Sequence, residues 1–146
     1  MSTGIVVRPA REEDTPALVA LAGEGLPLAS ADARARMIER ALADGLHELL
    51  VAKASEEIVG FIEWLLAYDV AEGAPIAYVL ALYVRPDWRQ KGVGTALFKA
   101  VMSRAKARGA SEIHASVVAE NEAAVRLYRR CGFTRVYLLL EAQLDQ

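Results

Sequence analysis

The sequence lacks the residues and runs that define several classes of protein. One cysteine in 146 residues excludes an internal disulfide framework and a cysteine-rich zinc site. The apolar runs are short and broken by charge, so no segment offers the roughly 20 apolar residues of a membrane-spanning helix. Internal repeats, low-complexity segments and linkers are also missing. We therefore expect one domain over residues 1–146, with no metal site and no membrane partner.

The chain is also short of net charge. The formal charge is −2 at pH 7, whereas a dedicated nucleic-acid binder is usually clearly basic, so we expect no nucleic-acid partner. Apolar residues make up 54% of the chain, which is enough for a folded core. The segment Met1–Pro9 lacks the basic start and apolar stretch of a signal peptide, which favours a cytoplasmic location.

The small net charge hides an uneven distribution. Residues 1–84 hold 6 Lys or Arg and 13 Asp or Glu, a net charge of −7. Residues 85–135 hold 11 and 4, a net charge of +7. Solvated helix faces that sort by sign would explain this pattern, but so would two surfaces with different electrostatic tasks.

The hydrophobic pattern predicts ten elements in the order β-α-α-β-β-β-α-β-α-β. Asp14 is expected to cap the first helix, and Ser30 or Asp32 the second. The stretch Phe133–Leu144 is β-prone and predicts one long strand or two short ones. The expected strands are 5–7, 48–54, 58–67, 76–84 and 112–118, and the expected helices are 14–21, 30–42, 92–108 and 121–131.

A glycine loop joins the apolar strand 76–84 to the helix that follows it. The loop reads Arg89-Gln90-Lys91-Gly92-Val93-Gly94-Thr95. Glycines let a backbone approach a ligand closely, and the first N–H groups of a helix favour anions such as a pyrophosphate. The P-loop pattern does not fit, because no lysine stands between Gly94 and Thr95, and the dinucleotide pattern lacks its third glycine. A plain strand-to-helix turn is the alternative.

Two motifs in this region resemble a known family. The first is Arg89-x-x-Gly92-x-Gly94 after the strand end Leu82-Tyr83-Val84. The second is Asn121-x-x-Ala124-x-x-x-Tyr128 followed by Gly132-Phe133. Their order and separation resemble the GCN5-related N-acetyltransferases, the GNAT family, strongly over residues 80–133 and loosely before them.

The resemblance implies a fold and an activity. The fold class would be α/β (α+β), with a central mixed, mostly antiparallel sheet that splays between the fourth and fifth strands and about four flanking helices. The activity would be transfer of an acetyl group from acetyl-CoA, as co-substrate, to a primary amine. By resemblance, the cofactor-binding residues would be Leu82, Tyr83, Val84, Arg89, Gln90, Lys91, Gly92, Val93, Gly94, Thr95, Asn121, Ala124 and Tyr128.

The resemblance also implies catalytic roles. Tyr128 would be the general acid that protonates the departing thiolate, and an N–H near Leu82 would polarise the acetyl carbonyl. A core tyrosine and an ordinary paired strand are the structural alternatives. The base departs from the family, because positions 80–82 are Leu, Ala and Leu, where many members carry a carboxylate. Glu63 is our candidate base, with Tyr78, Glu24, His47 and a water chain left as alternatives.

The acidic first part would face the acceptor, so we expect a cationic small-molecule or peptide amine. The apolar run Val136–Leu140 needs cover, and exchange of this tail with a second chain would form a homodimer. Two rival interpretations remain at this point. One is an acyl-CoA sensor without turnover, and the other is an interaction protein with an empty fold.

Overall fold

Elements of the first 115 residues follow the hydrophobic pattern closely. The computed structural model describes residues 4–25 and 29–144. The chain forms two units, residues 1–115 and 116–146, and each is described by itself. The prediction of a single domain over residues 1–146 stays a prediction.

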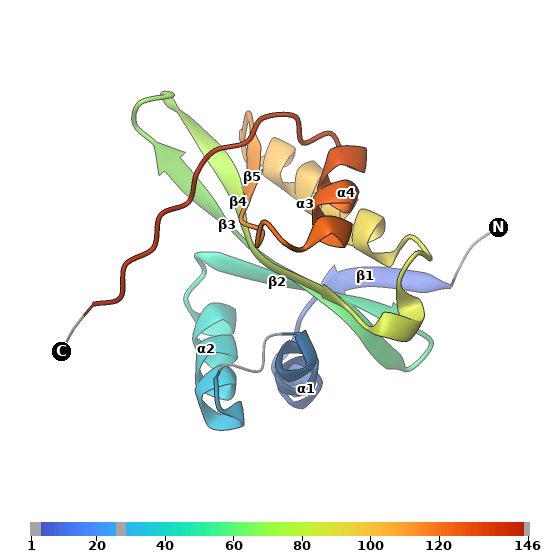
Figure 1. Cartoon of the computed structure of the whole chain (residues 1–146). Coiled ribbons are helices and arrows are strands. Elements are labelled where there is room, and N and C mark those ends of the chain that lie inside the picture. The colour runs from blue at the N-terminus through green and yellow to red at the C-terminus, as the bar shows by residue number, and fades with distance from the viewer. Residues whose placement is uncertain (1–3, 26–28, 145–146) are drawn as a thin grey trace. The chain divides into compact units, whose positions relative to one another are not determined.

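A five-stranded sheet forms the centre of the first unit (Figure 1). The strands lie side by side in chain order, and neighbours are antiparallel except for the parallel last pair. This is the mixed, mostly antiparallel sheet predicted from the sequence. The strands are β1 (Ile5–Pro9), β2 (His47–Ala54), β3 (Glu57–Asp69), β4 (Ala74–Val84) and β5 (Ile113–Ala115).

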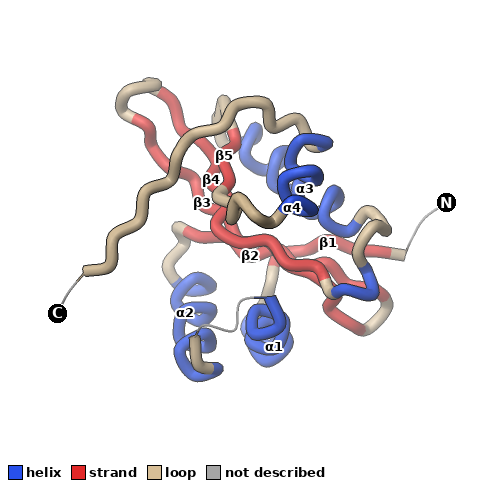
Figure 2. The backbone as a smooth tube through the Cα atoms, viewed as in Figure 1, coloured by secondary structure: helices blue, strands red, loops and turns tan. Residues whose placement is uncertain are grey.

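Three helices of this unit cover the two faces of the sheet (Figure 2). The helices α1 (Thr15–Gly25) and α2 (Ala31–Ala43) pack on one face, and α3 (Val93–Ala107) packs on the other. Two short 3₁₀ turns, η1 (Glu12–Asp14) and η2 (Pro86–Trp88), lead into α1 and the glycine loop. Ser30 caps α2 as predicted, since its hydroxyl accepts the Ala33 N–H at 3.1 Å. The sequence predicts a loop at Gly23, Gly25 and Pro27, but α1 continues through both glycines, and Pro27 lies outside the described residues.

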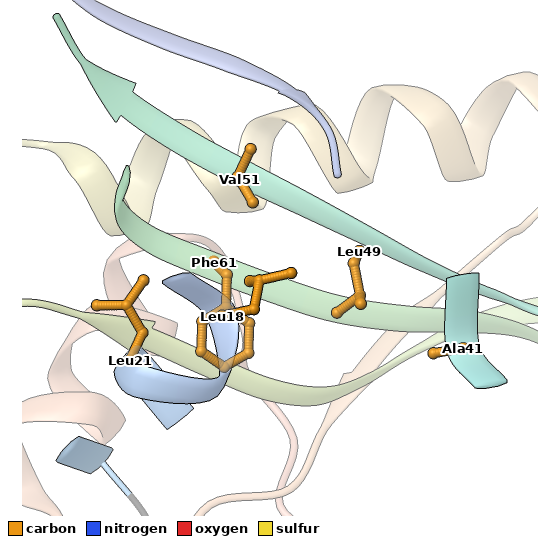
Figure 3. Close-up of a cluster of buried hydrophobic side chains, with 6 residues drawn as sticks. All are labelled: Leu18, Leu21, Ala41, Leu49, Val51 and Phe61. Atoms are coloured by element: carbon orange, nitrogen blue, oxygen red, sulfur yellow. The ribbon is translucent and has the colours of Figure 1, made fainter. Parts of the chain in front are cut away.

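Alternation along the strands separates two apolar clusters. Phe61 of β3 joins the cluster beneath α1 and α2, whose buried members are Leu18, Leu21, Ala41, Leu49, Val51 and Phe61 (Figure 3). Its neighbour Gly60 faces the opposite way, because a Cβ there would meet Val93 and Leu97 of α3. The second cluster therefore lies under α3, where Leu97 is fully buried.

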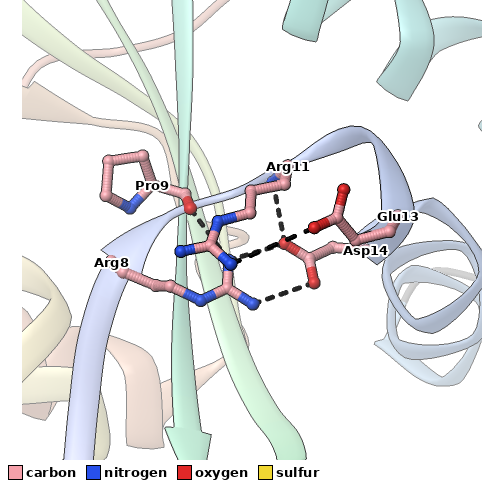
Figure 4. A network of polar contacts seen from close by, with 5 residues as sticks. All are labelled: Arg8, Pro9, Arg11, Glu13 and Asp14. Carbon is pink, nitrogen blue, oxygen red and sulfur yellow. Dashed lines mark hydrogen bonds and ion pairs between the residues drawn. The ribbon is translucent and has the colours of Figure 1, made fainter.

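Asp14 does not cap α1, so that prediction is wrong. Its carboxylate, nearly buried, accepts bonds from the Arg8 guanidinium at 2.7 and 3.0 Å and from the Arg11 N–H at 2.7 Å (Figure 4). The Arg8 hydrogen bond holds the pKa of Asp14 below its usual value, although burial opposes this. The carboxylate therefore binds the charged Arg8 side chain of β1 and not the N–H groups at the start of α1. This bond connects β1 to η1.

The second unit contains one helix and a tail without regular structure. Helix α4 (Glu122–Arg130) begins after Asn121, whose side chain accepts the Ala124 N–H at 3.1 Å. Residues 133–144 form no strand, so the strands predicted for Phe133–Leu144 are wrong. The predicted strand 112–118 shortens to Ile113–Ala115. A segment with strand propensity forms a strand only where it has a pairing partner. Within the described chain, Ile113–Ala115 pair with β4, whereas residues 116–118 and 133–144 pair with no strand.

Candidate active site

The loop between β4 and α3 presents backbone N–H groups at a helix start. Gly92 has a φ of 85°, in the left-handed region, and turns the chain into α3. The first bond of the helix runs from the Ala96 N–H to the Gly92 carbonyl at 3.0 Å. The N–H groups of residues 93–95 precede it and therefore have no partner inside the helix. Such a helix start attracts an anion.

Both cations of this loop are held against aromatic rings. The Arg89 Nε donates to the Val84 carbonyl at 2.9 Å, and its guanidinium lies 5.4 Å from the centre of the Tyr83 ring. The Lys91 ammonium lies 5.0 Å from the centre of the Trp88 ring. The two positive charges are thus fixed within the segment that leads into α3, Arg89 on the Tyr83 ring and Lys91 on the Trp88 ring.

Strand β4 has an open edge next to this loop. Its pairing with β5 covers only Ala77–Val79, whereas its pairing with β3 continues to Val84. The Arg85 N–H donates to the Val59 carbonyl of β3 at 2.9 Å, so alternation turns the backbone of Leu82 and Val84 away from β3. The sheet is therefore splayed between its fourth and fifth strands, as predicted, and the peptide groups of these two residues face the opening.

A β-bulge at Leu80 lies where this opening begins, and the sequence did not predict it. In the register of β3 with β4, Trp64 lies opposite Val79 and the next pair is Glu63 with Ala81, which leaves Leu80 without a partner. Bulges bend a strand and often lie next to functional sites. No glycine or proline marks the position, so the sequence carried no local signal for it.

Glu63 lies opposite Ala81, immediately beyond the bulge. Its side chain shares a sheet face with Phe61 and Leu49, which is the face covered by α1 and α2. The residue is half-buried, and burial raises the pKa of this carboxyl above its usual value. A carboxylate thus lies next to the strand positions where the family pattern expects one, although it belongs to the neighbouring strand.

The alternative bases lie beside other polar side chains. Glu24 accepts a hydrogen bond from the Tyr83 hydroxyl at 3.2 Å. The Tyr83 ring packs against Gly25, where an added Cβ would lie 2.5 Å from the ring. His47 Nδ1 lies 2.9 Å from the Asp44 carboxylate. The other histidine, on β5, pairs with Glu112 at 3.0 Å, and Tyr78 stands beside it in the register.

The second motif lies in the second unit, on α4 and the residues after it. Asn121 caps α4, which is a sufficient structural reason for an asparagine at this position. Tyr128 is buried, its ring centre lies 5.4 Å from that of Phe133, and burial raises the pKa of its phenol. A phenol with a raised pKa stays protonated at neutral pH and can donate a proton. Cys131, which precedes Gly132 and would be expected from the sequence to be a buried structural thiol, is only partly buried.

Two further observations bear on the class of protein. Among residues 4–25 and 29–144, no three His, Cys, Asp or Glu side chains are grouped so that they could hold a metal ion. Over the same residues, no helix combines the length and the apolar character needed to cross a membrane.

Comparison with known proteins gives relatives of one kind. A 100-residue match, 33% identical, links 66% of this chain to 65% of an aminoglycoside N(6')-acetyltransferase type 1 from Stenotrophomonas maltophilia. A 102-residue match, also 33% identical, links 70% of it to 55% of an L-methionine sulfoximine/L-methionine sulfone acetyltransferase from Pseudomonas paraeruginosa. The chain thus spans less than two thirds of either relative.

The fold has a close structural counterpart. An aminoglycoside N-acetyltransferase, AAC(6')-Iy, solved in complex with CoA, superposes with a TM-score of 0.88 at 19% identity, over 100% of this chain and 98% of that one. A model of the Acetyltransferase (GNAT) family matches residues 15–133. The match includes the glycine loop, the splayed strand and the α4 motif, and the chain therefore belongs to the GNAT acetyltransferase family.

Proposed function

We propose that this chain is an N-acetyltransferase that moves an acetyl group from acetyl-CoA to a primary amine. The observation that carries the proposal is the conjunction of an anion-binding helix start with an open strand edge in one unit. CoA combines a pyrophosphate with the amide groups of pantetheine, and it needs both kinds of partner. The rival of an interaction protein with an empty fold explains neither feature.

The residues present fit acetyl-CoA as co-substrate. Backbone N–H groups of residues 90–95, with the cations Arg89 and Lys91, would hold the pyrophosphate. The outward-facing peptide groups of Leu82 and Val84 would pair with pantetheine, and the Leu82 N–H would polarise the acetyl carbonyl. By resemblance to the family alone, Asn121, Ala124 and Tyr128 are further candidate cofactor-binding residues. Acetyl-CoA supplies the activated acyl group, as a thioester.

The chain's own groups would handle the protons. Glu63 would accept a proton from the ammonium form of the acceptor, because only the neutral amine attacks a carbonyl. Its raised pKa brings it closer to neutral pH, where a base works best. Tyr128 would then give its phenol proton to the departing sulfur.

We propose a cationic acceptor, either a small molecule or a peptide amine. The first 84 residues, with a net charge of −7, include α1, α2 and the sheet face that carries Glu63. A negative field concentrates cations and repels anions. The names of the two relatives, which refer to aminoglycosides and to an amino-acid derivative, are consistent with an amine acceptor. The cytoplasmic location stays a prediction.

The direct experiment is thiol release from acetyl-CoA across a panel of amines. We expect turnover with polyamines, aminoglycosides or lysine peptides, and at least tenfold lower kcat/KM with amines that carry extra carboxylates, because of the acidic acceptor side. Preference for acidic acceptors would contradict the cationic class. Binding of acetyl-CoA without turnover of any amine would favour the sensor interpretation.

Replacement of Gly92 by alanine tests the cofactor loop. A side chain in the left-handed region costs about 1–2 kcal/mol, so the free loop relaxes and must be restored on binding. We expect the Kd for acetyl-CoA to rise about 5- to 30-fold by calorimetry. Gly73→Ala is the matched control, since Gly73 also has a positive φ and open space around it but lies in the β3–β4 turn. Equal losses in both variants would refute the assignment.

Glu63→Gln and Tyr128→Phe test the two proton-transfer roles. Each is expected to lower kcat by about 10²–10⁴-fold, and Glu63→Gln should leave the Kd for acetyl-CoA unchanged. Because the pKa of Glu63 is raised and its carboxylate is the active form, wild-type kcat/KM should fall as the pH drops through that pKa, and Glu63→Gln should lose this acid limb. The controls Glu56→Gln and Tyr68→Phe change exposed residues. Wild-type kcat in either test variant would remove that residue from the mechanism.

We also propose that the tail pairs two chains into a homodimer. Six large apolar side chains between Val136 and Leu144 are each at least 65% exposed, an unusual apolar surface for a monomer. Light scattering should give twice the 15.8 kDa chain mass, and Leu138→Asp combined with Leu140→Asp should give the single mass. A wild-type protein of 15.8 kDa at micromolar concentration would contradict the proposal.

A further inference from the structure

Asp44 and His47 form a fixed pair at the start of β2. One Asp44 oxygen accepts the N–H groups of Leu46 and His47 at 2.8 and 3.1 Å. The other lies 2.9 Å from His47 Nδ1. These backbone bonds hold the pKa of Asp44 below its usual value, so the carboxylate is ionised at neutral pH.

This pair fixes the tautomer and direction of the imidazole. An ionised carboxylate only accepts, so Nδ1 carries the hydrogen and donates it to Asp44. The second ring nitrogen, Nε2, is then the acceptor in the neutral ring. The His47 side chain is 27% exposed, which leaves the ring in contact with water.

The register places this pair beside Glu63. His47 lies opposite Leu65 and Leu49 lies opposite Glu63, so His47 and Glu63 are diagonal neighbours. Both occupy the sheet face beneath α1 and α2, because residues two apart on a strand share a face. Diagonal neighbours are within reach of long side chains. Both residues are partly buried, and the His47 side chain is 27% exposed.

Few other groups face this cluster. The charges that act on Glu63 are those of His47, which lowers its pKa, and of Asp44, which raises it. Helix α2 contributes the apolar side chains of Ile38 and Leu42 to this face. Strand β4 contributes the phenol of Tyr78, opposite Leu65.

We propose that His47, oriented by Asp44, carries the acceptor's proton from Glu63 to solvent. His47 is a positioning residue in this scheme, because it acts through Glu63 and not on the reacting atoms. The inference rests on the proposed N-acetyltransferase function and adds a proton exit to it. It also gives a role to the Asp44–His47 pair, whose histidine is a diagonal neighbour of Glu63 on the sheet face beneath α1 and α2.

The proton balance requires such an exit. The acceptor enters as R–NH₃⁺ and gives one proton to the Glu63 carboxylate. The neutral amine then forms the C–N bond while the C–S bond breaks. The sulfur takes the phenol proton of Tyr128, and the second nitrogen proton returns to that phenolate. One proton remains on Glu63 and leaves through His47 Nε2 to water, which resets the carboxylate.

His47→Ala tests the proposal, with His114→Ala as the matched control. The chain has only these two histidines, and each pairs with a nearby carboxylate. We expect His47→Ala to lower kcat about tenfold or more, up to the 10²–10⁴-fold of a lost acid–base group, with an unchanged Kd for acetyl-CoA. Added imidazole should restore its kcat in proportion to concentration, and the control should show neither effect.

The pH profile supplies a readout that a merely structural role does not change. Because His47 lowers the pKa of Glu63, its removal should move the acid limb of kcat/KM to higher pH in His47→Ala. His47→Gln, which retains a donor for Asp44, should keep the fold yet show the same shift if the alanine variant is unstable.

Three outcomes separate the possible failures. An active wild type whose His47 variants match the His114 control, with no imidazole rescue and no shifted limb, would overturn the relay alone. A wild type that binds acetyl-CoA but acetylates no amine would overturn the proposed function and the relay with it. Loss of activity that imidazole does not restore, with an unmoved acid limb, would assign His47 a structural role and also overturn the relay.

Discussion

The candidate site depends on the interruption of strand pairing at Leu80. Up to Val79, β4 is a central strand with a neighbour on each side. Beyond the bulge it keeps only β3, and the peptide groups of Leu82 and Val84 lose their ladder partners on the other side. Unpaired strand edges are normally blunted or covered, because exposed backbone groups attract other chains. An open edge deep in a sheet, next to a helix start, is better explained as a place for an extended ligand that carries amide groups.

The same sheet separates two electrostatic tasks. The glycine loop and its two ring-held cations follow β4, at the beginning of the region with a net charge of +7. The sheet face beneath α1 and α2 carries Glu63 and His47, in the region with a net charge of −7. The net charge of the chain thus changes sign at the end of β4. The burial that raises the pKa of Glu63 comes from the same apolar cluster that holds α1 and α2 on the sheet.

The sequence predicted most of the fold, but it did not predict how the candidate site residues are arranged. Hydrophobic periodicity placed the strands up to Val84 and the helix after Gly92, because these elements are specified by local pattern and punctuation. The splay followed from resemblance alone, because no residue type marks the bulge at Leu80, where the splay begins. Asp14 was misassigned because its partner Arg8 lies on a neighbouring element, where a local capping rule does not look. The tail Phe133–Leu144 has the composition of a strand, and composition does not supply a partner. The pairing of Asp44 with His47, and their position beside Glu63, needed the register of β2 with β3.

Two sets of backbone N–H groups would contact the cofactor most directly: those facing the opening at Leu82 and Val84, and those at the start of α3. Hydrogen–deuterium exchange with and without acetyl-CoA measures both sets at once. Exchange at Leu82, Val84 and residues 92–95 should slow when acetyl-CoA is added, while exchange at Tyr83, whose backbone faces β3, should not change. Unchanged exchange at both sets, under conditions in which acetyl-CoA is bound, would contradict this assignment of the cofactor site.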